Sequence, residues 1–134
     1  MAHFLFNVPA GERDAAAAHL RAQTWVIGED EPHGDALAPG DLVLIYVAGP
    51  GGGFIGRAEV RAAAGPSSGG VRLADVERWD RAVPMRTVVA RVDPTASNPL
   101  VQANATTGFG TAVVRITAGE YEAAVDACRD YQAG

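Results

Sequence analysis

The sequence predicts an α+β fold, a small curved β-barrel of about six strands with two main helices beside it. The first observation is a pair of apolar runs, 41–47 and 54–60, that a Gly/Pro-rich turn separates, which is typical of a hairpin. The second is that such runs outnumber the segments with helical character, residues 10–24 and 118–131. The third is that neither a repeat nor a linker divides the 134 residues, so one domain over 1–134 is expected.

The hairpin in the middle of the chain carries the strongest strand signal. Residues 41–47 are mostly β-branched or aromatic, so we expect a strand that is buried on both faces. Pro39-Gly40 is a turn signal before this strand. Gly56, inside the partner strand, indicates a bulge or the close approach of another backbone or a ligand. Further strands are expected at 4–8, 71–79, 85–92 and 111–116.

Two segments favour helices. Residues 10–24 combine acids in the first turn with a run of alanines, a pattern typical of a helix packed closely on a sheet. Residues 118–131 follow a capping box, formed by Thr117 and Glu120, that predicts the start of a second helix. Cys128 falls on the apolar stripe of that helix, so we expect a core residue rather than a nucleophile.

The charge balance argues against a general nucleic-acid-binding surface. The formal net charge is −5, and all 11 basic residues are arginines. Because non-specific binding depends on neutralising phosphates, an acidic chain would need a local arginine cluster or a pocket for a single base. One cysteine, no apolar run long enough to span a membrane and no secretory signal together predict a cytoplasmic protein without a membrane partner.

Motifs for catalysis, metals and cofactors are missing from the sequence. It contains no Gly-x-Ser-x-Gly, Walker, His-Glu-x-x-His or Cys-x-x-Cys pattern, so neither an enzyme nor a cofactor is expected. The acidic loop 29–35 matches neither an EF-hand nor a zinc pattern, and we interpret it as solvated. Residues 49–53 are rich in glycine but precede a strand, which favours a hairpin turn over a phosphate-binding loop. His19 has no second ligand three or four residues away, so we expect a partly exposed surface histidine.

The two tryptophans are the clearest candidates for ligand binding. Trp25 and Trp79 both fall at the ends of expected elements, next to loops, in a chain with few aromatic residues. Stacking a flat ligand on such a ring contributes about 1–3 kcal/mol per base. The alternative is that each indole simply packs the rim of the barrel, and the sequence leaves both interpretations open.

An ordered set of motifs resembles the EVE domains of the PUA-like superfamily, which are relatives of YTH and ASCH domains. The aromatic-rich start at 3–7 resembles their opening strand, and Trp25-Val26-Ile27-Gly28 after a helix resembles their tryptophan segment, which a polar loop follows. Pro39-Gly40-Asp41 with the partner strand 55–60 resembles their central hairpin. Residues 108–121 resemble their closing strand and helix.

This resemblance implies a non-catalytic nucleic-acid-binding module that holds one modified base in an aromatic pocket. It implies that Trp25 is one wall of the pocket and that Asn7 and the backbone of Val26 contact the edge of the base. Trp79 is the candidate for a second stacking aromatic, and Asn104 is a further candidate for hydrogen bonds to the base. The implied partner is DNA or RNA with a modified base, bound at a single site.

Arg57, Arg78 and Arg81 are the candidates for phosphate contacts. Two alternatives stay open beside this reader hypothesis. One is a small-molecule hydrolase of the ASCH type that acts on a modified nucleoside, for which Glu59 or Asp75 would supply the acid; the lysine associated with that chemistry is absent. The other is a protein-interaction module with a vestigial pocket.

Overall fold

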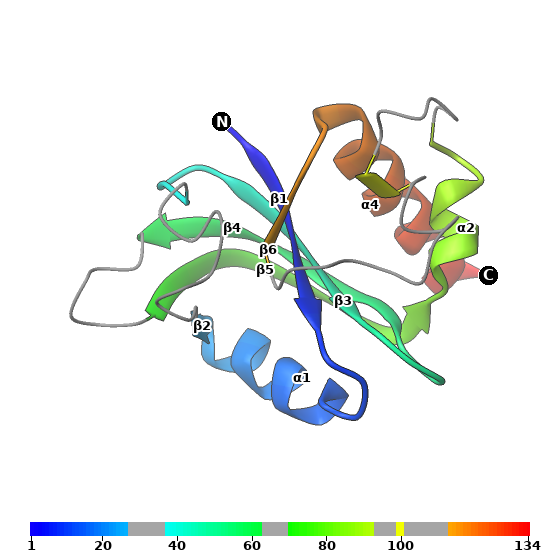
Figure 1. Ribbon diagram of the computed structural model, residues 1–134, viewed down its shortest axis with the longest axis horizontal. Helices are drawn as coiled ribbons and strands as arrows, with labels where there is room; N and C mark the ends of the chain where they lie inside the picture. Colours follow the sequence, from blue (N-terminus) through cyan, green and yellow to red (C-terminus); the bar gives the residue numbers. More distant parts are fainter. Residues whose placement is uncertain (27–36, 63–69, 93–98, 101–112) are drawn as a thin grey trace.

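The computed structural model describes residues 1–26, 37–62, 70–92, 99–100 and 113–134, and Figure 1 shows how its helices and strands are arranged. The strands are β1 (His3–Val8), β2 (Thr24–Val26), β3 (Leu42–Val47), β4 (Gly53–Ala62), β5 (Gly70–Val83) and β6 (Val113–Ile116). The helices are α1 (Arg13–Ala22), α2 (Met85–Val89) and α4 (Ala118–Ala133). Within these ranges, no helix is long and apolar enough to cross a membrane.

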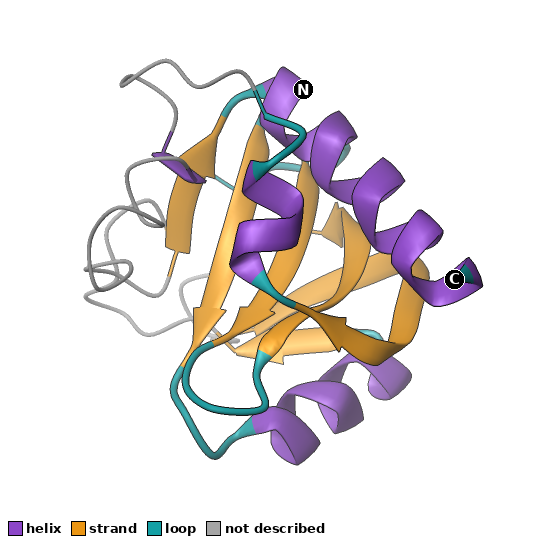
Figure 2. Cartoon of the chain, turned by 90° about the vertical axis from the view of Figure 1, so that its right-hand side faces the viewer, coloured by secondary structure: helices purple, strands orange, loops and turns teal. Residues whose placement is uncertain are grey.

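The six strands form one curved sheet in the order β2-β5-β4-β3-β1-β6. β1 runs parallel to β3, and the other neighbours pair antiparallel. Figure 2 shows helices on both sides of this sheet, with α1 on one side and α2 and α4 on the other. The predicted α+β curved barrel with two main helices is therefore confirmed, with the sheet curled into a half-barrel.

Each face of the sheet carries its own hydrophobic core. In β3, Val43 and Ile45 pack into the core beneath α1, whereas Leu44 between them packs into the core beneath α4. This alternation follows from the two-residue period of a strand, and all three side chains are fully buried. The prediction of a central strand buried on both faces is confirmed. Burial of this kind is the main favourable term in folding.

A β-bulge in β5 exchanges the faces of its two halves. Arg57 pairs with Glu77 but Glu59 pairs with Ala74, so β5 carries one residue more than β4 between these two pairs. Asp75 lies within the insertion and has a positive φ of 50°. Because one inserted residue reverses the alternation, Val71 and Leu73 face α1, but Trp79 faces α4.

Gly56 is required by close packing on both sides of β4. A Cβ atom at this position would lie 2.7 Å from the carbonyl oxygen of Glu77 and 3.0 Å from Cδ1 of Leu20 in α1. The register of β4 also shifts between Phe54 and Gly56. The prediction that Gly56 marks a bulge or a close approach is confirmed, and the atoms that approach it belong to β5 and α1.

The prediction of a strand at 85–92 is wrong. Met85–Val89 is the short helix α2, and Pro84 precedes it in an extended conformation that lets its carbonyl accept from Thr87 N at 3.0 Å. The β-branched residues that suggest a strand instead bury Val88 in the core beneath α4. Tertiary packing thus overrides the weak local strand preference. The sixth strand of the sheet is β2, directly after α1.

The capping box predicted before the last helix is present. The side chain of Thr117 accepts from Glu120 N at 3.1 Å, and Glu120 Oε1 accepts from Thr117 N at 3.0 Å. The second carboxylate oxygen of Glu120 accepts from Leu100 N at 2.7 Å. The buried carboxylate therefore fixes the start of α4 and ties the segment at 99–100 to it.

Candidate functional site

A pocket of about 210 Å³ opens between α1, the end of β1 and β2. We call it the Trp25 pocket. It combines one aromatic ring with an amide, a carboxylate and an imidazole, set among small apolar side chains. Its lining residues are Asn7, Val8, Pro9, Glu12, Ala15, Ala16, His19, Trp25 and Val26.

The indole of Trp25 is held by two other rings. Phe6 stacks on it, with ring centroids 5.3 Å apart and 26° between the planes. His19 lies against it in a tilted arrangement, with centroids 5.6 Å apart. Only 9% of Trp25 is exposed, so the ring is part of the core beneath α1 and also a wall of the pocket. Packing of Trp25 in the core is therefore confirmed, and stacking of a ligand on the part of the ring that lines the pocket stays a prediction.

The end of α1 places Trp25 on the sheet. Gln23 ends the helix in the left-handed conformation, with φ 60° and ψ 36°, which reverses the chain direction at once. Its carbonyl accepts from Leu73 N at 2.9 Å, and Trp25 then pairs with Val71 at the edge of the sheet. The ring of Trp25, three residues beyond the last residue of α1, is thus brought back under this helix.

Polar groups approach the pocket from two elements. Asn7 lies near the end of β1, where it pairs with Tyr46 of β3. Glu12 and His19 line the same flank of α1 at a spacing of seven residues, which is two helical turns. Val26 is 67% exposed at the rim. The pocket therefore offers hydrogen-bond donors and acceptors beside an aromatic ring, which suits a flat, polar heterocycle.

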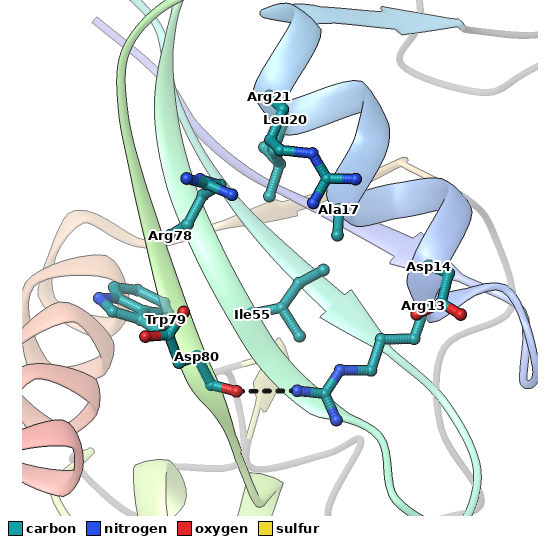
Figure 3. Close-up of a pocket in the computed structure, with 9 residues that line it drawn as sticks. All are labelled: Arg13, Asp14, Ala17, Leu20, Arg21, Ile55, Arg78, Trp79 and Asp80. Atoms are coloured by element: carbon teal, nitrogen blue, oxygen red, sulfur yellow. Dashed lines mark hydrogen bonds between the residues drawn. The ribbon is translucent and has the colours of Figure 1, made fainter.

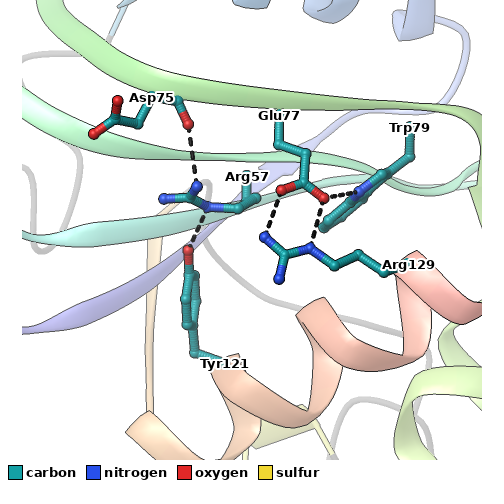
Figure 4. Close-up of polar contacts among 6 residues, drawn as sticks. All are labelled: Arg57, Asp75, Glu77, Trp79, Tyr121 and Arg129. Carbon is teal, nitrogen blue, oxygen red and sulfur yellow. Dashed lines mark hydrogen bonds and ion pairs between the residues drawn. The ribbon is translucent and has the colours of Figure 1, made fainter.

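The structure brings Asn7, Trp25 and Val26 around one pocket, but it does not bring Trp79 there. Trp79 is 5% exposed and belongs to the core beneath α4. Its indole Nε1 donates to Glu77 Oε2 at 2.8 Å (Figure 4). The bulge in β5 is the physical reason, since it turns Trp79 to the opposite face from Trp25. Asn104 lies outside the described residues.

Two of the three predicted phosphate-contact arginines also face α4. Arg57 donates from Nε to the Tyr121 hydroxyl at 2.7 Å and from Nη1 to the carbonyl of Asp75 at 3.1 Å (Figure 4). Arg81 lies over the ring of Tyr131, with its guanidinium carbon 4.5 Å from the ring centroid. These arginines connect the sheet to α4, and they are on the opposite face of the sheet from the Trp25 pocket.

The same face holds a paired carboxylate. Glu77 forms an ion pair with Arg129 of α4, with 2.7 Å between Oε1 and Nη2. The hydrogen bonds from Arg129, together with the smaller one from Trp79, hold the pKa of Glu77 below its usual value. Glu77 therefore links β5 to α4 through its ion pair with Arg129.

Arg78, the third predicted arginine, faces α1. It lines a second pocket, of about 300 Å³, between α1 and the β4–β5 pair (Figure 3). Arg13, Arg21 and Arg78 all line it, and we call it the arginine groove. Trp79 borders the groove too, but its indole points away from it toward α4 (Figure 3).

Sequence reasoning missed Glu12 and His19 as pocket residues. His19 is half-buried against Trp25, which agrees with the expected partial exposure but gives it a position beside a candidate ligand. The signal is the spacing of Glu12, Ala16 and His19, which places them on one helical stripe. The sequence does not show that this stripe faces Trp25, because that depends on the chain reversal at Gln23.

No group of metal ligands stands out among the residues that the structure describes, where no three His, Cys, Asp or Glu side chains cluster. Cys128 is fully buried, and burial raises the pKa of its thiol to about 12. The expected core role of Cys128 is confirmed. Glu59 and Asp75, the acids of the hydrolase alternative, line neither the Trp25 pocket nor the arginine groove.

Several solved structures of other proteins share the fold of this chain. No family model and no curated protein sequence matches the chain. Among solved structures, a Pseudomonas putida protein shares 17% identity over 94% of this chain and 99% of its own, with a TM-score of 0.67. Human THYN1, in complex with DNA that contains 5-methylcytosine, shares 15% identity over 91% of this chain and 94% of its own, with a TM-score of 0.60.

A third similar structure is the YTH domain of Toxoplasma CPSF4, in its apo form. It shares 11% identity over 91% of this chain and 84% of its own, with a TM-score of 0.53. The chain therefore shares the fold of THYN1 and of this YTH domain, which confirms the expected similarity of fold to EVE and YTH domains. At these identities, the similarity establishes the fold and leaves the function to be argued from the site.

Proposed function

We propose that the protein binds nucleic acid and holds one modified base in the Trp25 pocket. The observation that carries this proposal is the position of an aromatic-walled pocket at the junction of β1, α1 and β2. Support comes from the fold that the chain shares with THYN1, a protein crystallised with 5-methylcytosine DNA. A base in such a pocket has left its stack, so its flat faces and its hydrogen-bonding edge are both available.

The size of the pocket suits a single base. Its volume of about 210 Å³ lies below the range of roughly 300–1,000 Å³ typical of pockets for drug-sized ligands. Phe6 already covers one face of Trp25, so the guest approaches the remaining edge of the indole rather than entering between two open rings. The side chains that then face its polar edge are Asn7, Glu12 and His19.

The apolar side chains of the Trp25 pocket provide a physical basis for preferring a methylated base over an unmodified one. Val8, Ala15 and Ala16 lie among its lining residues. A methyl group placed against such side chains gains about 0.8 kcal/mol from burial, and an unmodified base leaves that space empty. A difference of this size corresponds to a preference of several-fold, which is measurable when the two oligonucleotides differ in nothing else.

The test is a titration with paired oligonucleotides that contain either cytosine or a single 5-methylcytosine, in DNA and in RNA. The variant Ala15→Leu fills the pocket from an exposed position of α1. Ala18→Leu is the matched control, because it is exposed on the same helix and lines none of the pockets described. Leucine and alanine have similar helix propensities, so neither change should perturb folding.

We expect the wild type and Ala18→Leu to bind the methylated oligonucleotide more tightly than its unmodified pair. Ala15→Leu should lose that preference. Equal affinities of the wild type for modified and unmodified oligonucleotides, in DNA and in RNA alike, would contradict the reader proposal for this base. Retention of the preference by Ala15→Leu would show that the base binds elsewhere.

A further inference from the structure

We propose that the arginine groove binds the phosphate backbone of the nucleic acid whose base enters the Trp25 pocket. This inference rests on the proposed function and adds the surface that holds the strand. Of the three arginines that the sequence predicted to contact phosphates, only Arg78 lies in this groove. Arg57 and Arg81 face α4, so Arg13 and Arg21 take their place in the proposal. All three arginines line one groove on the α1 side of the sheet (Figure 3).

The two flanks of α1 carry different chemistry. Arg13, Ala17 and Arg21 recur every four residues and line the arginine groove. Glu12, Ala16 and His19 form the neighbouring stripe and line the Trp25 pocket. One helix therefore separates the two pockets. Its width of ~10–12 Å corresponds to about three nucleotides at 3.4 Å of rise each, a distance that one strand can cover.

The positive charges in the groove are available to a ligand. Arg13 donates to the carbonyl oxygens of Gly51, at 3.3 Å, and Asp80, at 3.0 Å, which anchor it without cancelling its charge. Arg21 and Arg78 are exposed, and neither side chain forms a hydrogen bond or ion pair with any described residue. Arg21 lies on α1 and Arg78 on β5, on the two sides of the groove (Figure 3).

The local balance of charge differs from that of the whole chain. Asp14 and Asp80 also line the groove, so three arginines and two aspartates leave a formal charge of +1. The chain as a whole has a formal charge of −5. A phosphate is the anion that matches these groups best, because the planar fork of a guanidinium pairs with phosphate oxygens in a bidentate way. The floor of the groove between the arginines includes Ile55 and Ala17, which leaves room above it.

The experiment compares the full chain with two double variants in which the same charge is removed from opposite faces. Arg21→Gln with Arg78→Gln removes two charges from the groove. Arg86→Gln with Arg91→Gln removes two from the α2 region, on the far side of the sheet, and is the control of equal net charge; it also removes the ion pair of Arg91 with Asp130. Binding of a single-stranded 5-methylcytosine oligonucleotide and of its unmodified pair is measured between 50 and 200 mM salt. Far-ultraviolet circular dichroism and thermal unfolding confirm that both variants are folded.

The groove variant should bind both oligonucleotides more weakly than the wild type, by the same factor. The slope of log affinity against log salt should become shallower by about 1.4, which is ~0.7 for each lost phosphate contact on a single strand. The preference for the methylated oligonucleotide should stay unchanged, because phosphate contacts do not read the base. The control variant should keep the slope of the wild type.

A groove variant with the affinity and salt slope of the control would overturn the inference and leave the proposed function intact. A wild type that binds no oligonucleotide would overturn both. Failure of base recognition alone is distinct, because the preference for the methylated base is then absent while the salt slope still becomes shallower in the groove variant. A parallel titration with polyglutamate tests an acidic protein as the occupant. Binding of that polymer, lost only in the groove variant and without any change in oligonucleotide affinity, would also overturn the inference.

Discussion

The rings of Phe6 and Trp25 stack with their centroids 5.3 Å apart, which joins the opening strand to the residue that walls the candidate pocket. Trp25 is therefore both a core residue and a ligand-binding candidate. Truncating it should cost stability as well as binding. We expect Trp25→Ala to lower the free energy of unfolding by about 3–5 kcal/mol, as for other buried aromatic residues. Urea denaturation measures this, and near wild-type stability would contradict the stacking described.

Gly56 provides a test of the close packing between β4 and β5. In Gly56→Ala, the new Cβ would lie 2.7 Å from the Glu77 carbonyl oxygen, a backbone atom that cannot move freely. We expect a loss of roughly 1–3 kcal/mol from this overpacking. Gly119→Ala is the control, since a Cβ there meets no atom within 4 Å and the site is helical. It should keep or slightly raise the unfolding midpoint, and equal destabilisation of both variants would refute the packing argument.

The pair of Glu77 and Arg129 predicts a specific pH dependence of stability. The pKa of Glu77 is lowered in the folded state, first by the hydrogen bonds from Arg129, so the folded protein binds the proton less tightly than the unfolded chain. Its contribution is present above the unfolded value near 4.5 and is lost as the pH falls through the lower, folded value. Arg129→Gln should be less stable than the wild type at pH 7, and the gap should narrow as Glu77 becomes protonated. Unfolding curves between pH 7 and pH 3 test this, and a gap that does not change with pH would contradict it.

Cys128 should be inert in the folded protein. Burial raises the pKa of its thiol to about 12, so almost none of it is thiolate at neutral pH, and the side chain has no exposed surface. We expect no labelling by a maleimide at pH 7 under native conditions and complete labelling in denaturant. Mass spectrometry distinguishes the two states. Rapid native labelling would mean that α4 opens readily from the sheet.

Local signals in the sequence predicted the parts of the fold that depend on few residues. The capping box at Thr117 and the close approach at Gly56 both follow from residue types and spacing. The face of Trp79 could not be predicted, because it depends on one inserted residue at the bulge near Asp75, which pairing with β4 defines. The helical form of 85–89 depends in the same way on packing beneath α4.

The residues of the candidate site could likewise be predicted only in part from the sequence. Asn7, Trp25 and Val26 could be grouped before the structure, because the resemblance to EVE domains implies that these three residues form one pocket. Glu12 and His19 join it only through the chain reversal at Gln23. The grouping of Arg21 with Arg78 also needed the structure, because α1 and β5 are far apart in the chain and only the fold sets one beside the other.

The most direct test of the central claim follows the two indole N–H resonances by NMR as a 5-methylcytosine oligonucleotide is added. The variant Trp79→Phe assigns them. We expect the Trp25 resonance to shift strongly, whereas Trp79, bonded to Glu77 on the opposite face, keeps its position. A shift confined to Trp79, or no shift of Trp25 at saturating oligonucleotide, would contradict binding of the base in the Trp25 pocket.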